Sequence, residues 1–188
     1  MGADAEARPF FRADRYISDA VSEALSRVDP GTIVRILALL RKAPKVFVYG
    51  AGRSGIVGRA FAMRLVQCGL SAYVIGESVT PIVQKGDVVV IFSGQGESYS
   101  STQAANIVRR EGADLIVITA RSGSKIAHTA TVLVAFDFRE DSDRRTYAPL
   151  GTLFEAASLR LGDGLIAEWM HEQGETEDSM RRRHAIMV

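Results

Sequence analysis

Val46-Phe-Val-Tyr-Gly-Ala-Gly-Arg-Ser-Gly55 is the stretch that decides the fold, because an apolar run ends there in a glycine-rich loop. A second stretch, Val88-Val-Val-Ile-Phe-Ser-Gly-Gln-Gly-Glu-Ser98, repeats the arrangement. Each apolar run is typical of a buried parallel strand, and each loop precedes a predicted helix. Glycines let backbone N–H groups approach a ligand, and a helix N-terminus favours negative charge. Residues 50–55, called loop 1, and residues 93–98, called loop 2, therefore predict an anion-binding pocket.

Apolar periodicity places further strands and helices around these two stretches. Strands are expected at residues 45–49, 71–75, 87–92, 114–119 and 131–135. Helices are expected at residues 14–41 with a break at Pro30-Gly31, 54–68, 99–110, 152–172 and 175–184, with a short turn or helix at 125–129 and an exposed loop at 137–147. This alternation predicts an α/β protein, a three-layer α-β-α sandwich with a five-stranded parallel sheet. If the strand order is 2-1-3-4-5, the crossover direction reverses between the first and third strands, and both loops meet at one crevice.

The composition is that of a globular protein with a buried core. The chain has 188 residues, of which 47% are hydrophobic and 24% charged. This favours a single domain over residues 1–188, with N-terminal helices at about 14–41, the sheet core at about 45–136 and C-terminal helices at about 152–184. The net charge of +1 argues against nucleic acid or an anionic membrane surface as a partner.

Targeting segments and metal-binding patterns are not found in the sequence. No apolar run approaches the roughly 20 residues that cross a bilayer, and the N-terminus lacks a signal peptide, so a cytoplasmic location is expected. The single cysteine, Cys68, falls in an apolar helical stretch and is expected to be a small buried residue. The three histidines are scattered, so no metal site is expected.

The loops admit more than one interpretation. Gly50-Ala-Gly-Arg-Ser-Gly55 satisfies the dinucleotide pattern G-x-G-x-x-G. That pattern requires an acidic residue about twenty positions on, where Glu77 arrives late, and it leaves loop 2 unexplained. Loop 2 offers hydroxyls, an amide and bare backbone, which suit a phosphate, while Ser54 could add a hydroxyl and Arg53 a charge. The competing interpretations are a tight turn in which Ser98 caps the next helix, and a solvated Arg53.

The paired loops resemble those of the sugar isomerase (SIS) domain family, whose flavodoxin-like domains bind phosphosugars. Further stretches carry the resemblance: Phe61-Ala-Met-Arg-Leu65, Gly76-Glu-Ser-Val-Thr-Pro81, Pro149-Leu-Gly-Thr-Leu-Phe-Glu155 and Arg183-His184. The last three favour the hexulose-phosphate isomerase branch. The resemblance implies interconversion of 3-hexulose 6-phosphate and fructose 6-phosphate, the second step of the ribulose monophosphate route of formaldehyde fixation. It also implies a homotetramer whose sites a neighbouring subunit can complete.

The resemblance also implies the site residues. The implied phosphate contacts are Ser54, Ser93, Gln95 and Ser98. The loop sequences themselves add Gly52, Arg53, Gly94 and Gly96 as further substrate-binding positions. Glu155 is the implied catalytic base, and His184 is a candidate acid or donor for a neighbouring subunit's site. Gln95 and Ser98 stand where serine and threonine are frequent in the family, but both can still hydrogen-bond phosphate oxygens.

The implied reaction can proceed with one carboxylate. Moving a carbonyl from C3 to C2 requires a base that removes the C2 proton and returns a proton to C3 through a cis-enediolate. No metal or organic cofactor is demanded, provided that neutral or cationic donors stabilise the enediolate oxygens. Two other functions stay open at this point, a different phosphosugar aldose–ketose isomerase and a non-catalytic phosphosugar sensor.

Both proposed catalytic residues have structural alternatives in the sequence. Thr152-Leu-Phe-Glu155 matches a helix capping box, in which the glutamate reaches back to the backbone at the start of its own helix. His184 follows Arg181-Arg-Arg183, and a terminal run of charges is usually solvated. The sequence alone favours these structural roles, and the family resemblance reverses the preference for Glu155.

Overall fold

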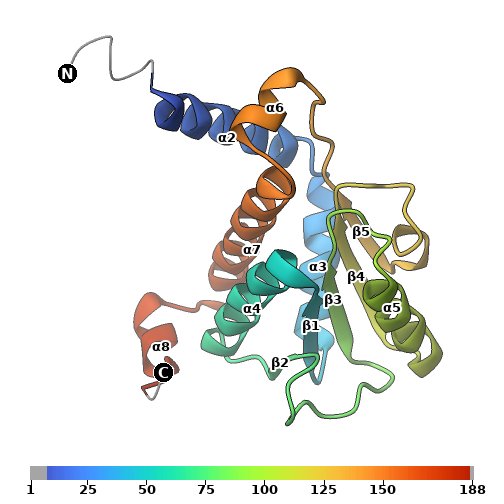
Figure 1. Cartoon of the computed structure of the whole chain (residues 1–188). Helices are drawn as coiled ribbons and strands as arrows, with labels where there is room; N and C mark the ends of the chain where they lie inside the picture. Colours follow the sequence, from blue (N-terminus) through green and yellow to red (C-terminus); the bar gives the residue numbers. More distant parts are fainter. Residues whose placement is uncertain (1–7, 187–188) are drawn as a thin grey trace.

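Strands and helices alternate along the chain in the computed structural model, which describes residues 8–186 (Figure 1). The strands are β1 (Val46–Gly50), β2 (Ala72–Val74), β3 (Val88–Phe92), β4 (Asp114–Thr119) and β5 (Val132–Ala135). The helices are α2 (Pro9–Ser26), α3 (Pro30–Lys42), α4 (Gly52–Gln67), α5 (Tyr99–Glu111), α6 (Ser142–Tyr147), α7 (Thr152–Gln173) and α8 (Glu177–Arg182), with a short 3₁₀ turn η1 (Ala127–Thr129). No helix of the described residues is long and apolar enough to cross a membrane.

The strands form one five-stranded sheet in the order β2-β1-β3-β4-β5, and every pair is parallel. The predicted fold class and strand order are confirmed. Strand β2 lies on one side of β1, and the chain then crosses to β3 on the other side. The crossover direction therefore reverses between β1 and β3, the strands that carry loop 1 and loop 2. Gly50, the last residue of β1, lies opposite Phe92, the last residue of β3. The two loops therefore leave the sheet side by side.

The sheet is covered on both faces because successive strand residues point to opposite sides. On one face Val48, Val90 and Phe92 pack with apolar residues of α3, α4 and α7. On the other face Phe47, Val89, Ile91 and their neighbours pack with Ala105 and Val108 of α5. Figure 1 shows α5 on one side of the sheet, with α4 and α7 on the other side. Three layers result, and burying each large side chain contributes about 1.5–3 kcal/mol.

The charged segment at 137–147 is not wholly a loop, which corrects the prediction. Its second half is helix α6, which lacks buried residues and so shows no apolar stripe in the sequence. The helix is held by Asp141, whose carboxylate accepts a hydrogen bond from the Arg144 N–H at 2.9 Å. The same carboxylate accepts one from the Tyr16 hydroxyl of α2 at 2.9 Å. Burial and this hydrogen bond raise the pKa of Tyr16 to about 12.

Three helix boundaries also differ from expectation. The first helix begins at Pro9, where proline suits the first helical turn. Helix α4 begins at Gly52, so the last residues of loop 1 form its first turn. Helix α8 covers only Glu177–Arg182, because Thr176 caps its start through the Ser179 N–H. The second of these shifts matters for the site, since it puts loop 1 at a helix N-terminus.

Candidate functional site

Loop 1 is shaped by close backbone packing. A Cβ atom on Gly55 would lie 2.4 Å from the Gly50 carbonyl oxygen, and one on Gly50 would lie 2.8 Å from the Gly55 nitrogen. Gly52 adopts a φ of 57°, in the left-handed region that favours glycine. The residue before α4 is Ala51, which supplies no side-chain cap. The first N–H groups of α4 are therefore left for another partner, at the positive end of the helix dipole.

Loop 2 is held by its own hydrogen bonds. The Ser93 hydroxyl, buried, accepts a hydrogen bond from the Gly96 N–H at 3.2 Å. Gly96 has a φ of 65°, and the Ser124 hydroxyl fills the space where its Cβ would be, at 2.1 Å. Ser98 is the N-cap of α5 and accepts from the Ser101 N–H at 3.2 Å. The capping role predicted as the alternative for Ser98 is thus confirmed.

Helix α7 begins across both loops. The Phe154 ring lies 3.2 Å from the position of a Cβ on Gly94, so this helix packs directly on loop 2. On the next residue, the Glu155 carboxylate accepts a hydrogen bond from Arg53 Nε of loop 1 at 2.6 Å. Glu155 exposes only 12% of its side chain, whereas Arg53 exposes 74%. A mostly buried carboxylate is therefore held beside a guanidinium where α7 meets the two loops.

The capping box predicted for Glu155 as its structural alternative is wrong. The N-cap of α7 is Gly151, and Thr152 is the first helical residue. The Thr152 hydroxyl donates to the Pro149 carbonyl at 2.7 Å instead of capping the helix. Glu155 turns to Arg53, so a contact across the fold overrides a local sequence pattern. The same ion pair means that Arg53 is not simply solvated.

Arg121 joins loop 2 from the segment that follows β4, and no motif in the sequence pointed to it. Its Nε donates to the Gln95 Oε1 at 3.1 Å. Its backbone position is fixed because the Ala120 N–H donates to the Gly94 carbonyl at 3.0 Å, which continues the sheet ladder past the strand ends. The available signal was positional: Arg121 follows β4 as the two loops follow β1 and β3.

Glu77, the acidic residue required by the dinucleotide interpretation, has a different partner. Its carboxylate lies 2.8 Å from a guanidinium nitrogen of Arg59 on α4, and both side chains are about half exposed. Among residues 8–186 no group of histidine, cysteine, aspartate or glutamate side chains is arranged to hold a metal ion. The groups on and beside the two loops are hydroxyls, amides, backbone N–H groups, Arg53, Arg121 and Glu155.

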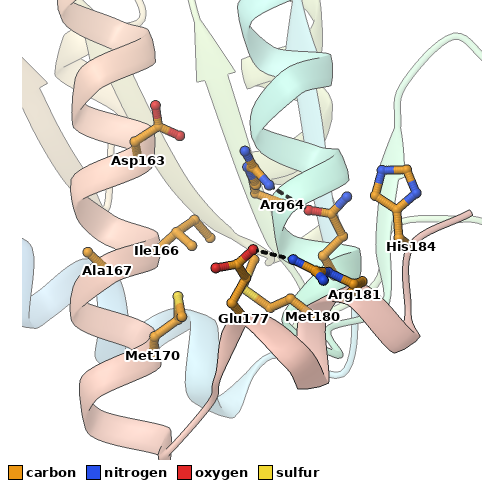
Figure 2. Close-up of a pocket in the computed structure, with 10 residues that line it drawn as sticks. Arg64, Asp163, Ile166, Ala167, Met170, Glu177, Met180, Arg181 and His184 are labelled. Carbon is orange, nitrogen blue, oxygen red and sulfur yellow. Dashed lines mark hydrogen bonds and ion pairs between the residues drawn. The ribbon is translucent and has the colours of Figure 1, made fainter.

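His184 is not brought to the two loops within one chain. It lies beyond α8, exposed, with Nδ1 2.8 Å from the Ala185 carbonyl oxygen. Figure 2 shows it beside a cavity of about 440 Å³ that Arg64 of α4, Met170 of α7 and Arg181 of α8 also line. Loop 1 and this cavity lie at opposite ends of α4. This helix has 16 residues, so its length is about 24 Å.

The end of the chain is anchored rather than solvated at Arg183. Its guanidinium forms two 3.0 Å hydrogen bonds with the Glu175 carboxylate and donates to the Gln67 carbonyl at 2.9 Å. Hydrogen bonds from Arg183 and Ser179 hold the pKa of Glu175 below its usual value. The neighbouring His184 is therefore presented from a fixed backbone.

Known proteins are similar to this chain in sequence and in fold. Residues 39–152 match the model of the SIS domain. An uncharacterized protein of Archaeoglobus fulgidus is 34% identical over 175 residues, which cover 91% of this chain and 96% of that protein. A 3-hexulose-6-phosphate isomerase of Methylomonas aminofaciens is 36% identical over 153 residues, 80% of this chain and 84% of that enzyme.

A solved structure agrees with these matches. The crystal structure of a Methanococcus jannaschii protein, for which a function as 3-hexulose-6-phosphate isomerase was inferred, is similar with a TM-score of 0.83 at 28% identity. The similarity covers 92% of this chain and 97% of that one. All five strands and both loops lie within the matched residues 39–152.

Proposed function

Because this chain belongs to the SIS domain family, we propose that it is a 3-hexulose-6-phosphate isomerase. The enzyme would interconvert 3-hexulose 6-phosphate and fructose 6-phosphate in the ribulose monophosphate route. The observation that carries the proposal is the place of Glu155, paired with Arg53 of loop 1 at 2.6 Å on a helix that also packs on loop 2. A carboxylate beside two loops rich in neutral donors has the parts that a phosphosugar isomerase needs.

The phosphate binds between the loops. The uncapped N-terminus of α4, with Gly52 and Ser54, faces it from loop 1. Ser93, Gln95, Ser98 and the glycines at positions 94 and 96 contribute hydroxyl, amide and backbone donors from loop 2.

Glu155 removes the proton from C2 and returns it to C3. As its carboxylate takes the proton it loses its negative charge, and the charge appears on the enediolate oxygen. Arg53, which pairs with that carboxylate before proton transfer, then stabilises the enediolate instead. The positive charge is thus already beside the reacting groups before proton transfer begins.

Carbon numbering gives the reaction a direction-dependent feature. In the 3-ketose, O6 carries the phosphate and O5 could close only a four-membered ring, so this substrate is acyclic. Fructose 6-phosphate forms a ring that must open before C3 can react. A histidine that only opens the ring would therefore matter more for the reaction that starts from fructose 6-phosphate.

The test is direct turnover. Purified protein receives 3-hexulose 6-phosphate, made from formaldehyde and ribulose 5-phosphate by a synthase, and fructose 6-phosphate is measured with time. A parallel reaction offers ribulose 5-phosphate alone and looks for an aldose phosphate. Folded protein that makes no fructose 6-phosphate contradicts the proposal, and turnover of the pentose phosphate alone indicates an aldose–ketose isomerase.

His184 completes the site of a neighbouring subunit in a homotetramer. Its distance from loop 1 within one chain, and its fixed presentation beside the cavity of Figure 2, support this arrangement. A mixture of His184→Ala and Glu155→Gln proteins tests it, because a shared site becomes intact in some mixed oligomers. Recovered turnover in the mixture, with Arg182→Gln active as the control, is expected. Turnover equal to the sum of the two separate variants contradicts shared sites.

A further inference from the structure

We infer that Arg121 is a further substrate-binding residue, which supplies the positive charge for the phosphate at loop 2. The inference rests on the proposed function, because it takes the ligand of the crevice to be a sugar phosphate. Arg121 lies on the segment that follows β4, outside both glycine-rich loops.

The charges of the assigned residues leave a phosphate at loop 2 without a cation. A phosphate monoester carries a charge of about −1.5 to −2 near pH 7. Loop 2 offers neutral hydroxyls and an amide, and it adds a negative charge at the exposed Glu97. The guanidinium of Arg53 is already opposite the Glu155 carboxylate. A second cation at the crevice would balance the ligand.

The backbone of Arg121 is fixed to loop 2 by a chain of hydrogen bonds. The Thr119 hydroxyl donates to the Gly94 carbonyl at 3.2 Å and accepts from the Arg121 N–H at 3.1 Å. One step along the ladder, the Ala120 N–H donates to the same carbonyl at 3.0 Å. Any movement of loop 2 toward a ligand is therefore shared by residue 121.

Loop 2 orients the side chain of Arg121 and leaves its two Nη groups available as hydrogen-bond donors. Its Nε is bound to Gln95 Oε1 at 3.1 Å. Within residues 8–186, neither of its terminal Nη groups has a recorded hydrogen bond or ion pair. Two Nη groups on a planar guanidinium match two oxygens of one phosphate, which a lysine cannot do. Gln95 acts here as a positioning residue for the arginine.

A nearby lysine provides the contrast that isolates this effect. Lys125 lies on the same segment, carries the same charge and is exposed, but the described residues show no hydrogen bond or ion pair between it and loop 2. A general attraction of the basic segment for anions would involve both side chains. A specific phosphate contact involves Arg121 alone.

Calorimetric titration tests the inference with three variants, Arg121→Gln, Arg121→Lys and Lys125→Gln. The probes are fructose 6-phosphate and inorganic phosphate. Losing a charge-assisted contact is expected to weaken binding of both probes about tenfold to hundredfold in Arg121→Gln. Arg121→Lys should fall between this variant and the wild type, because it keeps the charge without the fork. Lys125→Gln should bind within about twofold of the wild type.

Kinetics and stability separate binding from structural damage. In Arg121→Gln the KM for 3-hexulose 6-phosphate should rise by the same factor as the Kd, while kcat stays within about threefold, because the phosphate is remote from C2 and C3. The thermal midpoint should stay within about 2 °C, since the side-chain contact is exposed. A Kd within twofold of the wild type, or an equal loss in Lys125→Gln, overturns the inference.

Binding data also keep this inference apart from the proposed function. Wild-type protein that binds fructose 6-phosphate but does not isomerise it contradicts the proposed reaction. In that case the titration of the Arg121 variants still tests whether Arg121 binds the phosphate. Wild-type protein that isomerises 3-hexulose 6-phosphate while Arg121→Gln keeps its affinity overturns only the role of Arg121. Wild-type protein that binds neither probe overturns both.

Discussion

Loop 1 and loop 2 have similar sequences, yet different forces hold them in place. In loop 1 the backbone of Gly50 packs on the backbone of Gly55, and the described residues show no hydrogen bond from the Ser54 hydroxyl. In loop 2 the Ser93 hydroxyl binds the Gly96 N–H, and Ser98 caps a helix. The comparison teaches that a glycine-serine composition does not reveal which polar groups a ligand can use directly.

The difference assigns different work to the two loops during binding. Loop 1 presents the start of α4 without a side-chain cap, so its donors meet a phosphate with no bond to break. The hydroxyls of loop 2 already make hydrogen bonds within the protein. These hydrogen bonds must be shared or broken when a phosphate binds. We therefore expect that replacing a polar side chain of loop 1 leaves the free energy of unfolding nearly unchanged. Replacing one of loop 2 should lower it.

The largest effect is expected for Glu155→Gln, which tests whether the ion pair at loop 1 is chemical or structural. Glutamine keeps a hydrogen-bond acceptor for Arg53 but cannot take a proton, so kcat should fall by about 10²–10⁴ while the thermal midpoint stays unchanged. Steady-state kinetics and thermal unfolding measure the two quantities. Glu168→Gln, on the exposed surface of the same helix, α7, is the matched control and should keep its activity. Activity of Glu155→Gln within about tenfold of the wild type contradicts its role as base.

The next largest effect is expected for Gly55→Ala, which tests the backbone packing that holds loop 1. Gly55→Ala places a Cβ 2.4 Å from a backbone oxygen that cannot move aside, so the free energy of unfolding should fall by about 3 kcal/mol. In Gly96→Ala the clash is with the Ser124 side chain. In urea unfolding, Gly96→Ala should therefore be less stable than the wild type. The double variant Gly96→Ala/Ser124→Gly should regain part of the stability that Gly96→Ala loses. Failure of this rescue would mean that the positive φ of Gly96, rather than the contact, sets the cost.

The sheet was predictable from sequence because its signals are local. Apolar runs and glycine-rich ends predicted all five strands, and β4 has the predicted boundaries. The conditional strand order is observed, and it brings the ends of β1 and β3, with loop 1 and loop 2, side by side. The strands themselves depend on residues within a few positions of one another, whereas their order is a long-range property that entered the sequence analysis only as a condition.

The side-chain partners were not predictable because they cross the fold. Glu155 matches a capping box locally, yet its partner Arg53 is 102 residues away. Helix α6 is held to Tyr16 by a bond that spans 125 residues. Arg121 reaches Gln95 only because β3 and β4 are neighbours in the sheet. Single-sequence patterns contain no information on such pairs until the strand order is known.

A smaller effect is expected for Ser93→Ala, which removes the hydroxyl that holds loop 2 together. The Gly96 N–H would remain buried without its acceptor, which costs about 1–3 kcal/mol of unfolding free energy. Urea unfolding measures this loss, and titration with fructose 6-phosphate should show weaker binding as well. Ser100→Ala, on the exposed first turn of α5, is the control and should unfold like the wild type. Unchanged stability of Ser93→Ala would remove the distinction between the loops.

The smallest effect is expected for Ser54→Ala, the counterpart of Ser93→Ala in loop 1. The described residues provide no hydrogen-bond partner for the Ser54 hydroxyl, and alanine is favoured within a helix, so the free energy of unfolding should stay within about 0.5 kcal/mol. Loss of one neutral phosphate contact should raise the KM about two- to tenfold. A stability loss as large as that of Ser93→Ala would mean that hydroxyls hold both loops. An unchanged KM would remove Ser54 from the phosphate site and leave the N–H groups of α4 as the contribution of loop 1.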